Sequence, residues 1–292
     1  MPRILLATFQ LLPDGEAGGE ALVSALADRG IDAAWVRWDD PEVDWAAADL
    51  VAVRSTWDYY RRTPEFLAWT RAVPRLLNGP DVMAWNADKA YLRDLAAAGL
   101  PTVPTELLDD ATLVAGLTAA TERWGTVVVK PRTGAGGVGV CVVSSSSDER
   151  LEGLVAGPWV LQPLVESVRT TGETSVFVFG GDVASRVQKV PSGGDIRVNE
   201  LYGGSSRADV LTPEHEALAR AAVEAAVERH GRPIDYARVD MLTYDDRLVV
   251  SELELIEPGL YLDVVPANAA AFADMVATRL TRRQGDPPTT SI

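Results

Sequence analysis

The alternation of short apolar runs with amphipathic segments over the first 80 residues most constrains the fold of this chain. Apolar runs of strand length and segments of helical spacing follow one another in the order 3–9, 19–28, 31–38, 50–54 and 64–72. Such alternation is typical of βαβ units, which build parallel sheets. The sequence therefore predicts a Rossmann-like unit over residues 1–83, with a further short strand at 75–78 near its end.

A Gly-rich loop between two strands marks the middle of the chain. Residues 126–131 are a β-branched run that ends in Lys130-Pro131, four glycines lie within 134–139, and 140–144 is again a strand. Backbone N–H groups of glycines can approach a phosphate group closely because no Cβ intervenes. No Gly-Lys-Ser/Thr follows, and the next element is a strand, so the loop is neither a Walker loop nor a dinucleotide fingerprint. It predicts either phosphate binding or a plain strand connection.

The rest of the chain divides into a central unit, 84–167, and a C-terminal unit, 168–283, before a loose polar tail, 284–292. The central unit is expected to open with a helix from Asn86 to Gly99. In the C-terminal unit we expect an antiparallel strand pair at 175–179 and 183–190, followed by an exposed loop at 191–207. A long helix at 213–230, two more strands at 238–244 and 248–255, and a last helix at 268–282 complete the unit. The fold class is therefore α/β, with α+β character in the C-terminal half.

The last two predicted strands carry an acidic pattern. Asp240 lies on the first strand, and Glu252 and Glu254 lie two residues apart on the next, so the two glutamates point to the same face. Grouped carboxylates suit Mg²⁺ that bridges phosphates. The alternative is a solvated polar face of the sheet.

A polar segment, Arg54-Ser55-Thr56-Trp57-Asp58, follows a predicted strand of the first unit. Ligands of open α/β sheets bind at the carboxyl ends of strands. The segment predicts either part of a substrate site or a tight turn packed by aromatic rings.

Composition excludes several classes of function. The formal net charge of −15 argues against a broad nucleic-acid surface. No apolar run approaches the ~18 residues of a membrane span, and the N-terminus lacks the pattern of a signal peptide, so we expect a cytoplasmic protein with no membrane partner. One cysteine and two histidines make a structural zinc site implausible.

Six motifs, taken in order, resemble the ATP-grasp superfamily over residues 3–277. They are Asn86-x-x-Lys89, Val129-Lys130-Pro131 with the Gly-rich loop, Leu161-Gln162-Pro163-Leu164-Val165, Gly172-Glu173-Thr174-Ser175, Arg238-Val239-Asp240 and Glu252-Leu253-Glu254. The resemblance implies an ATP-grasp fold, with a Rossmann-like N-terminal unit, a central lid subdomain and a C-terminal antiparallel-sheet domain.

The resemblance also implies that the chain binds ATP and Mg²⁺. It implies that Lys89 and Lys130 contact the ATP phosphates, beneath a lid of Gly136, Gly137 and Gly139. Adenine would bind along the hinge residues Gln162, Pro163, Leu164 and Val165, and the ribose would bind Glu173. Mg²⁺ would bind Asp240, Glu252 and Glu254, and Arg238 would lie near the transferred phosphoryl group. Many members have Glu-x-Asn where this chain has Glu-x-Glu, which makes Glu257 a rival metal ligand.

The implied reaction joins a carboxylate to a nitrogen nucleophile through an acyl phosphate. Arg54 and Arg197 are the candidates for binding the substrate carboxylate, with surface salt bridges as the alternative reading, because arginine grips carboxylates with two hydrogen bonds. Several segments are similar to an ATP-grasp subgroup that includes the cycloserine synthetase of antibiotic biosynthesis, which would imply ring closure of O-ureido-serine.

We therefore expect a small amino-acid-like substrate. The alternatives are a phosphotransferase that acts on a hydroxyl and a nucleotide-binding module without turnover. Dimers are common among relatives, but no sequence feature demands a homodimer.

Overall fold

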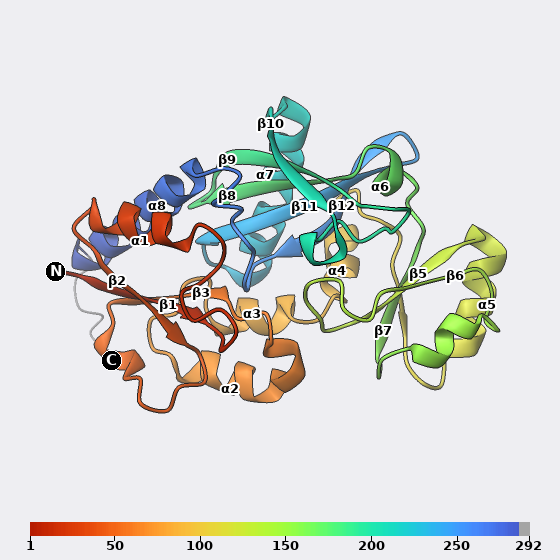
Figure 1. Ribbon diagram of the computed structural model, residues 1–292, viewed down its shortest axis with the longest axis horizontal. Coiled ribbons are helices and arrows are strands. Elements are labelled where there is room, and N and C mark those ends of the chain that lie inside the picture. The colour runs from red at the N-terminus through yellow and green to blue at the C-terminus, as the bar shows by residue number, and fades with distance from the viewer. Residues whose placement is uncertain (286–292) are drawn as a thin grey trace.

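The computed structural model describes residues 1–285, and their strands form three separate sheets (Figure 1). A three-stranded sheet and a five-stranded sheet lie together in the larger part of the molecule. The four-stranded sheet forms a lobe of its own at the right of the view. No helix within the described residues has the length and apolar character needed to cross a membrane. Of the polar tail expected at 284–292, residues 284–285 belong to the last helix, and residues 286–292 lie outside the described part of the chain.

The N-terminal sheet is parallel, with the strand order β2-β1-β3, and it confirms the α/β expectation for this part of the chain. Its strands and the helices around it are β1 (Arg3–Thr8), α1 (Gly19–Ala27), β2 (Asp32–Arg37), β3 (Leu50–Ser55) and α2 (Thr63–Ala72), with short 3-10 turns at Trp45–Ala47 and Tyr59–Arg62.

The prediction of a strand at 75–78 was wrong, because only a single β-bridge forms there, between Leu76 and Val51. Asn78 turns the chain away with a φ of 60°, and Gly79 follows with a φ of 82°. The left-handed region is costly for most residues, so a turn is fixed at this point. The backbone therefore leaves the sheet after one pairing.

The helix expected from Asn86 to Gly99 is two helices, α3 (Pro80–Asn86) and α4 (Tyr91–Ala97), and Asn86 ends the first of them. Proline at the first helical position begins α3 earlier than expected. The Asn86 side chain donates to the Leu253 carbonyl and accepts from the Leu255 N–H, so it fastens α3 to the C-terminal sheet. Lys89 consequently lies in the turn between the two helices.

The four-stranded lobe is antiparallel, with the order β4-β7-β5-β6. It consists of β4 (Glu106–Leu108), α5 (Leu113–Trp124), β5 (Val127–Pro131), β6 (Cys141–Val143), a 3-10 turn at Glu149–Gly153 and β7 (Trp159–Pro163). The Gly-rich segment joins β5 to β6, as the sequence predicts. Sequence analysis had identified neither β4 nor α5.

The C-terminal sheet is antiparallel, with the order β10-β9-β8-β11-β12. Its elements are α6 (Ser167–Thr170), β8 (Glu173–Phe179), β9 (Asp182–Val190), a 3-10 turn at Glu200–Tyr202, β10 (Ser205–Asp209), α7 (Pro213–His230), β11 (Tyr236–Tyr244), β12 (Arg247–Glu254) and α8 (Ala267–Gly285). The loop expected at 191–207 ends early, because residues from Ser205 onward pair with β9 and form an edge strand.

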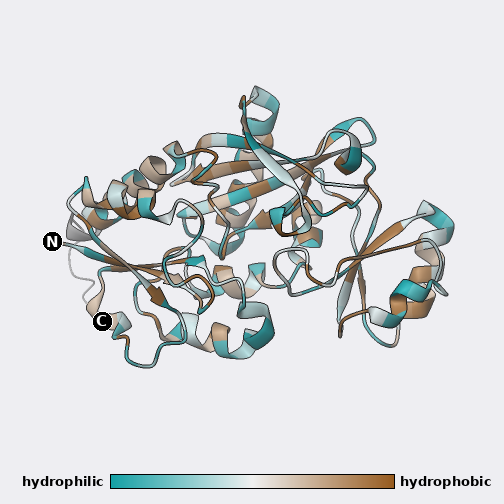
Figure 2. Ribbon diagram, in the orientation of Figure 1, coloured by the Kyte–Doolittle hydropathy of each residue, from teal (hydrophilic) through white to brown (hydrophobic). Residues whose placement is uncertain are grey.

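The first and last parts of the chain share one apolar core. Buried residues of β1 and α1, such as Ile4 and Leu22, pack in one cluster with Phe177 of β8 and Phe272 of α8. Figure 2 shows the apolar residues gathered along the strands, with hydrophilic residues on the outer turns of the helices. Burial of this continuous apolar surface holds the parallel and the five-stranded sheets in a fixed relation.

Candidate functional site

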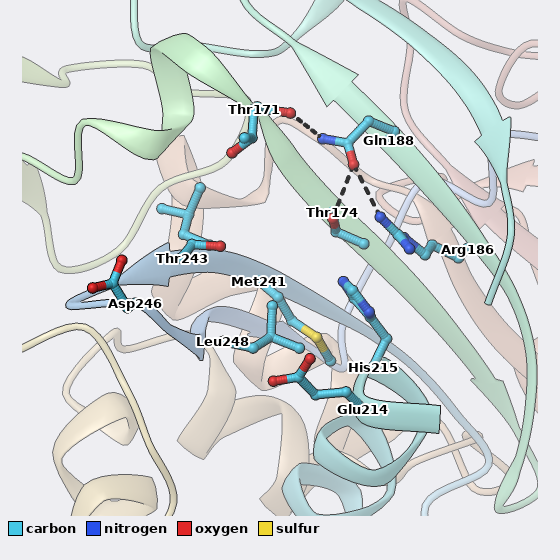
Figure 3. A pocket seen from close by; sticks show the side chains of 12 residues that line it. Thr171, Thr174, Arg186, Gln188, Glu214, His215, Met241, Thr243, Asp246 and Leu248 are labelled. Atoms are coloured by element: carbon cyan, nitrogen blue, oxygen red, sulfur yellow. Dashed lines mark hydrogen bonds between the residues drawn. The ribbon is translucent and has the colours of Figure 1, made fainter. Parts of the chain in front are cut away.

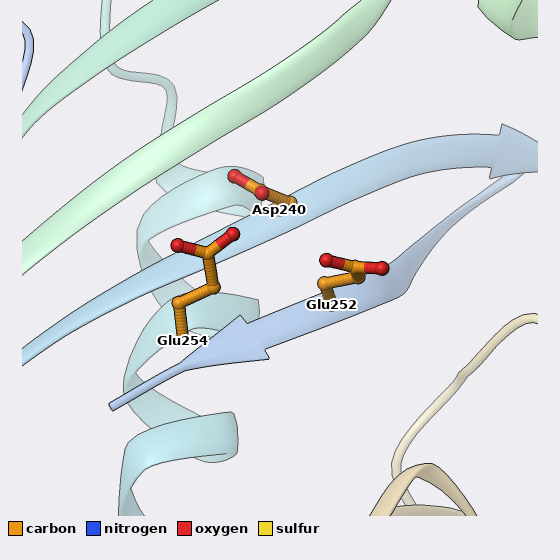
Figure 4. A group of neighbouring side chains, drawn as sticks. All are labelled: Asp240, Glu252 and Glu254. Carbon is orange, nitrogen blue, oxygen red and sulfur yellow. The ribbon is translucent and has the colours of Figure 1, made fainter. Parts of the chain in front are cut away.

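A bulge in the last hairpin brings the three predicted metal ligands together. The register between β11 and β12 shifts after Asp240, so Asp240 lies opposite Glu252, and Arg238 lies opposite Glu254. The carboxylates of Asp240, Glu252 and Glu254 point toward one another above the two strands (Figure 4). One oxygen of each lies within 4.8 Å of the others.

Both predicted phosphate-binding lysines reach this cluster from other parts of the fold. The Nζ atom of Lys130, at the end of β5, lies 3.5 Å from Glu252 Oε1. The Nζ atom of Lys89 lies 3.8 Å from the same oxygen and also donates to the Gly134 carbonyl, at 3.0 Å. The two lysines therefore meet the acidic hairpin where the four-stranded lobe faces the C-terminal sheet.

Sequence analysis missed a third lysine of the site, Lys189 on β9. Its Nζ atom lies 2.5 Å from Glu173 Oε1 and 3.4 Å from Asp240 Oδ1. Ser251 donates to the other Glu173 oxygen, at 3.2 Å, and Ser175 donates to Asp240, at 2.5 Å. The predicted ribose ligand Glu173 is thus connected to the carboxylate cluster through the buried ammonium group of Lys189.

The rarity of lysine among the basic residues of the chain could have drawn attention to Lys189. Lys89, Lys130 and Lys189 are the only three lysines of the chain, whereas the other 24 basic residues are arginines. All three lysines converge on one group of carboxylates. A lysine is a compact charge that approaches an anion from any direction, unlike the planar fork of arginine.

The charges of the site act on one another strongly. Burial would raise the pKa of Asp240, but the charges of Arg238 and Lys189 outweigh it and hold this pKa well below its usual range. Lys89 and Lys130 likewise overcome burial and lower the pKa of Glu252. These two acids therefore remain ionised at neutral pH.

Glu254 differs from the other two carboxylates of the cluster. Burial raises the pKa of Glu254 to about 7, helped by the charges of Asp240 and Glu252 and opposed by Arg238. Arg238 donates to both Asp240 and Glu254. It is therefore the cation that bridges the two strands of the hairpin.

The Gly-rich loop approaches the segment that contains Arg197. A Cβ atom at Gly137 would lie 3.4 Å from the Arg197 side chain and 3.4 Å from the Tyr202 ring. Arg197 pairs with Asp195, at 2.6 Å, and its guanidinium lies 3.6 Å from the centre of the Tyr202 ring. The Arg197 guanidinium is thus partly neutralised by Asp195 in its own loop, as in the surface-salt-bridge alternative. It lies beside the Gly-rich loop rather than beside the carboxylates.

The predicted hinge, Gln162 to Val165, covers the end of β7 and the residues just beyond it. Gln162 is buried, and its amide donates to Thr105 Oγ1, at 2.9 Å. The Leu164 N–H already donates to the Thr126 carbonyl, at 3.0 Å. Any adenine contact through the backbone must therefore use other groups of this segment.

The expectation that Arg54 binds a substrate carboxylate does not fit the structure. Its side chain is 0% exposed and pairs with Glu16, at 3.2 Å. It also donates to the Pro258 carbonyl and lies over the Tyr236 ring. Arg54 therefore connects three segments inside the protein, and a ligand cannot reach it.

The four residues that follow Arg54 are buried or hydrogen-bonded within the protein. Asp58 accepts hydrogen bonds from Trp38 and Arg62, which makes it part of the aromatic turn that was the alternative reading. Ser55 and Thr56 are fully buried, and their hydroxyls have no hydrogen-bond partner. Trp57 donates from its indole nitrogen to the Glu257 carbonyl, at 3.2 Å.

A separate cavity of about 210 Å³ lies on the opposite face of the C-terminal sheet (Figure 3). Gln188 occupies its wall and bonds to Thr171, Thr174 and Arg186. Side chains alternate between the two faces of a strand, so Gln188 and Thr174 point away from Lys189 and Glu173. None of the predicted site residues lines this cavity.

The donor set fits a magnesium nucleotide. Three carboxylates offer hard oxygen ligands, which Mg²⁺ prefers. Lys89 and Lys130 stand beside the carboxylates and can take phosphate oxygens. Anionic phosphates would be repelled by the acidic cluster unless a divalent cation lay between them.

Two family descriptions match the chain. Residues 4–78 match the N-terminal domain of D-cycloserine synthetase DcsG, and residues 102–243 match the ATP-grasp domain of prokaryotic glutathione synthetase. The cycloserine biosynthesis protein DcsG of Streptomyces lavendulae is 34% identical over 279 residues, which cover 89% of this chain and 92% of that protein. The glutathione synthetase of Bradyrhizobium diazoefficiens is 26% identical over 235 residues, which cover 77% of this chain and 68% of that protein.

Solved structures agree with these matches. The crystal structure of D-cycloserine synthetase DcsG superposes with a TM-score of 0.84 at 32% identity, covering 95% of this chain and 99% of that one. The D-alanine–D-alanine ligase of Bacillus anthracis superposes with a TM-score of 0.66 at 15% identity, covering 98% of this chain and 100% of that one, which is a likeness of fold.

Proposed function

The chain belongs to the ATP-grasp family that includes the D-cycloserine synthetase DcsG, and on this premise we propose that it activates the carboxylate of a small amino acid with ATP. It is accordingly an ATP-dependent carbon–nitrogen ligase. We further propose that its reaction is the ring closure of O-ureido-serine. The 34% identity to the cycloserine biosynthesis protein over nearly the full length of both chains supports this substrate.

The observation that carries the proposal is the meeting of Lys89, Lys130 and Lys189 with the carboxylates of one hairpin. These lysines come from three segments that are far apart in the sequence. Such a group is suited to a triphosphate bound with Mg²⁺, and Asp240, Glu252 and Glu254 are the proposed ligands of the metal. When bound, Mg²⁺ would neutralise charge on the phosphates being transferred.

In the proposed reaction the substrate carboxylate attacks the γ-phosphoryl group, which gives an acyl phosphate and ADP. The ureido nitrogen that is attached to oxygen then attacks the acyl carbon, loses its proton and displaces phosphate, so that the ring closes with the carbamoyl group still on this nitrogen. Water then removes the carbamoyl group as carbon dioxide and ammonia. Lys89 and Lys130 hold the phosphates, and Arg238 stabilises the negative charge near the transferred group. Positioning and fixed charges supply most of the acceleration in such chemistry. Gly136, Gly137 and Gly139 allow the loop to cover the phosphates, which protects the acyl phosphate from water.

The proposal is tested by ADP release with O-ureido-serine and no added amine. ADP formation that depends on O-ureido-serine supports the cyclising reaction, whereas release only after an amine is added indicates an intermolecular ligase. Hydroxylamine distinguishes both from a phosphotransferase that acts on a hydroxyl, because a hydroxamate forms only from an acyl phosphate. ATP binding without ADP release for any carboxylic acid would indicate a binding module.

A further inference from the structure

Glu257 differs from every other buried acid in the described part of the chain. Four carboxylate residues there are more than nine-tenths buried, namely Glu16, Asp235, Asp240 and Glu257. The first three form ion pairs with Arg54, Arg279 and Arg238 respectively. Glu257 has no ion pair, and its carboxylate accepts no hydrogen bond from another described residue. A buried charge without a partner is costly, so its presence requires an explanation.

Glu257 lies beside the carboxylate cluster of the last hairpin. The residue is 8% exposed and follows Glu254 by three positions, and two positions beyond it the Gly259 carbonyl accepts from Arg238, at 3.3 Å. The charges that act on it most are those of Glu254 and Lys89, which both line the site. Glu257 also acts on Tyr59, because the charge of Glu257 is the second cause, after burial, that raises the pKa of Tyr59. Glu257 therefore lies between the carboxylate cluster and the aromatic turn that follows β3.

The backbone around Glu257 is held rigidly. Trp57 donates to its carbonyl, at 3.2 Å, and Arg54 donates to the next carbonyl, that of Pro258. Glu16 accepts from the Leu260 N–H, at 2.5 Å. These contacts fix the backbone near Glu257, and no described lysine or arginine forms an ion pair with its carboxylate.

We propose that Glu257 binds the α-ammonium group of the amino-acid substrate and thereby selects amino acids over simple carboxylic acids. This inference rests on the proposed function. It assigns to the substrate a residue that the sequence had offered only as a rival metal ligand. The geometry argues against that metal role, because Glu257 is absent from the set of carboxylates whose oxygens approach one another closely enough to share an ion.

The charges of the site are consistent with this assignment. Burial raises the pKa of Glu257 to about 8, with a further increase from Glu254. An ammonium group placed beside it would lower that pKa again, because an opposite charge favours the ionised form. Binding of the amino acid would then restore the charge of Glu257 and form a charge-assisted hydrogen bond.

The test compares O-ureido-serine, in each enantiomer, with 3-(ureidooxy)propanoic acid, which lacks only the amino group. ADP release is measured at saturating Mg·ATP for the wild-type protein, for Glu257→Gln and for the control Glu224→Gln, which changes an exposed residue of α7. We expect the wild type to prefer the amino acid at least about 100-fold in kcat/KM, because a buried charged group rejects a ligand that leaves it unpaired. Glu257→Gln should raise KM for the amino acid about 100-fold and leave KM for the analogue unchanged. The control should behave as the wild type.

Other outcomes would overturn the inference. If the wild type uses both compounds equally well, Glu257 has no role in recognising the amino group, although the proposed function stands. If Glu257→Gln raises the Mg²⁺ concentration needed for half-maximal rate and leaves KM for the amino acid unchanged, Glu257 is a metal ligand. If the wild type releases no ADP with either compound or with other amino acids, the proposed function fails and this inference fails with it. Calorimetric binding of Mg·ADP to Glu257→Gln shows that the variant is folded.

Discussion

At the scale of single residues, the site is defined by where the chain places its few lysines. Three lysines among 27 basic residues all lie at the carboxylate cluster. Arginines form the ion pairs elsewhere, such as those of Arg54 with Glu16 and Arg132 with Asp88. A small number of lysines also makes them easy to follow individually.

Chemical acylation of amines should therefore report on the nucleotide site directly. The side chains of Lys89 and Lys130 are 15% and 18% exposed, whereas that of Lys189 is 3% exposed. We expect Mg·ATP to slow the acylation of Lys89 and Lys130 at least about 10-fold, because bound phosphates would cover their amines. The amino group of Met1, which is 84% exposed, should react at an unchanged rate. Mass spectrometry of peptides measures each rate, and equal rates with and without nucleotide would remove the lysines from the site.

The pH dependence of stability provides a second prediction at this scale. Because burial raises the pKa of Glu257 from 4.5 to about 8, the folded protein holds a proton that the unfolded chain releases. The stabilisation from this group is therefore complete below the unfolded pKa and disappears as pH rises through the folded value.

Between about pH 6 and about pH 9, the free energy of unfolding of the wild type should fall by on the order of 2 kcal/mol more than that of Glu257→Gln. Urea unfolding without ligands at both pH values measures this difference. Parallel decreases in the two proteins would mean that Glu257 titrates normally.

At the scale of elements, the Gly-rich loop between β5 and β6 depends on backbone conformations that glycine adopts readily. Gly136 has a φ of 63°, and a Cβ atom added there would meet nothing within 4 Å. A substitution by alanine at Gly136 therefore adds only a backbone penalty. Gly181, in the turn between β8 and β9, is a suitable control, with a φ of 97° and equally open surroundings.

Gly136→Ala and Gly181→Ala should each lower stability by about 1 kcal/mol, because alanine avoids the left-handed region. Only Gly136→Ala should weaken Mg·ATP binding, by about 5-fold, since its loop must keep that conformation to cover the phosphates. Thermal unfolding and calorimetric titration measure the two effects. Equal ATP affinity in the two variants would exclude the loop from nucleotide binding.

At the scale of the whole molecule, buried polar groups join the N-terminal sheet to the segment that follows the hairpin of β11 and β12. Arg54 and Glu16 hold residues 258–260, and Tyr236 donates to the carbonyls of Val53 and Ile256. Asn78 donates to the carbonyls of Tyr236 and Leu255. The position of the acidic hairpin therefore depends on the N-terminal unit, which we propose to delimit near residue 83.

Removal of Arg54 tests this connection. Arg54→Met should lower the free energy of unfolding by about 3–5 kcal/mol, because Glu16 would be left buried without its partner. Arg61→Met, which changes an exposed residue, should alter stability by less than about 0.5 kcal/mol. Chemical denaturation gives both values. Unchanged stability of Arg54→Met together with an increased KM for the substrate would restore Arg54 to the substrate site.

The sequence by itself determined the features that depend on residues only a few positions apart. Alternation along a strand puts Glu252 and Glu254 on one face, and the β-branched run before the Gly-rich loop defines β5. The order of the motifs was sufficient to predict the ATP-grasp fold, which the structure and its relatives confirm. These features are readable because each depends on residues only a few positions apart.

Only the tertiary structure decided which distant residues meet and which are buried. The tie of Lys189 to Glu173 needs the register between β8 and β9, and the pairing of Lys130 with Glu252 joins residues of two different sheets. Arg54 looked like a ligand-binding arginine because no local pattern reveals that Glu16 and Pro258 enclose it. Burial and long-range pairing arise when whole elements pack together, and this packing is a property of the folded chain rather than of any segment.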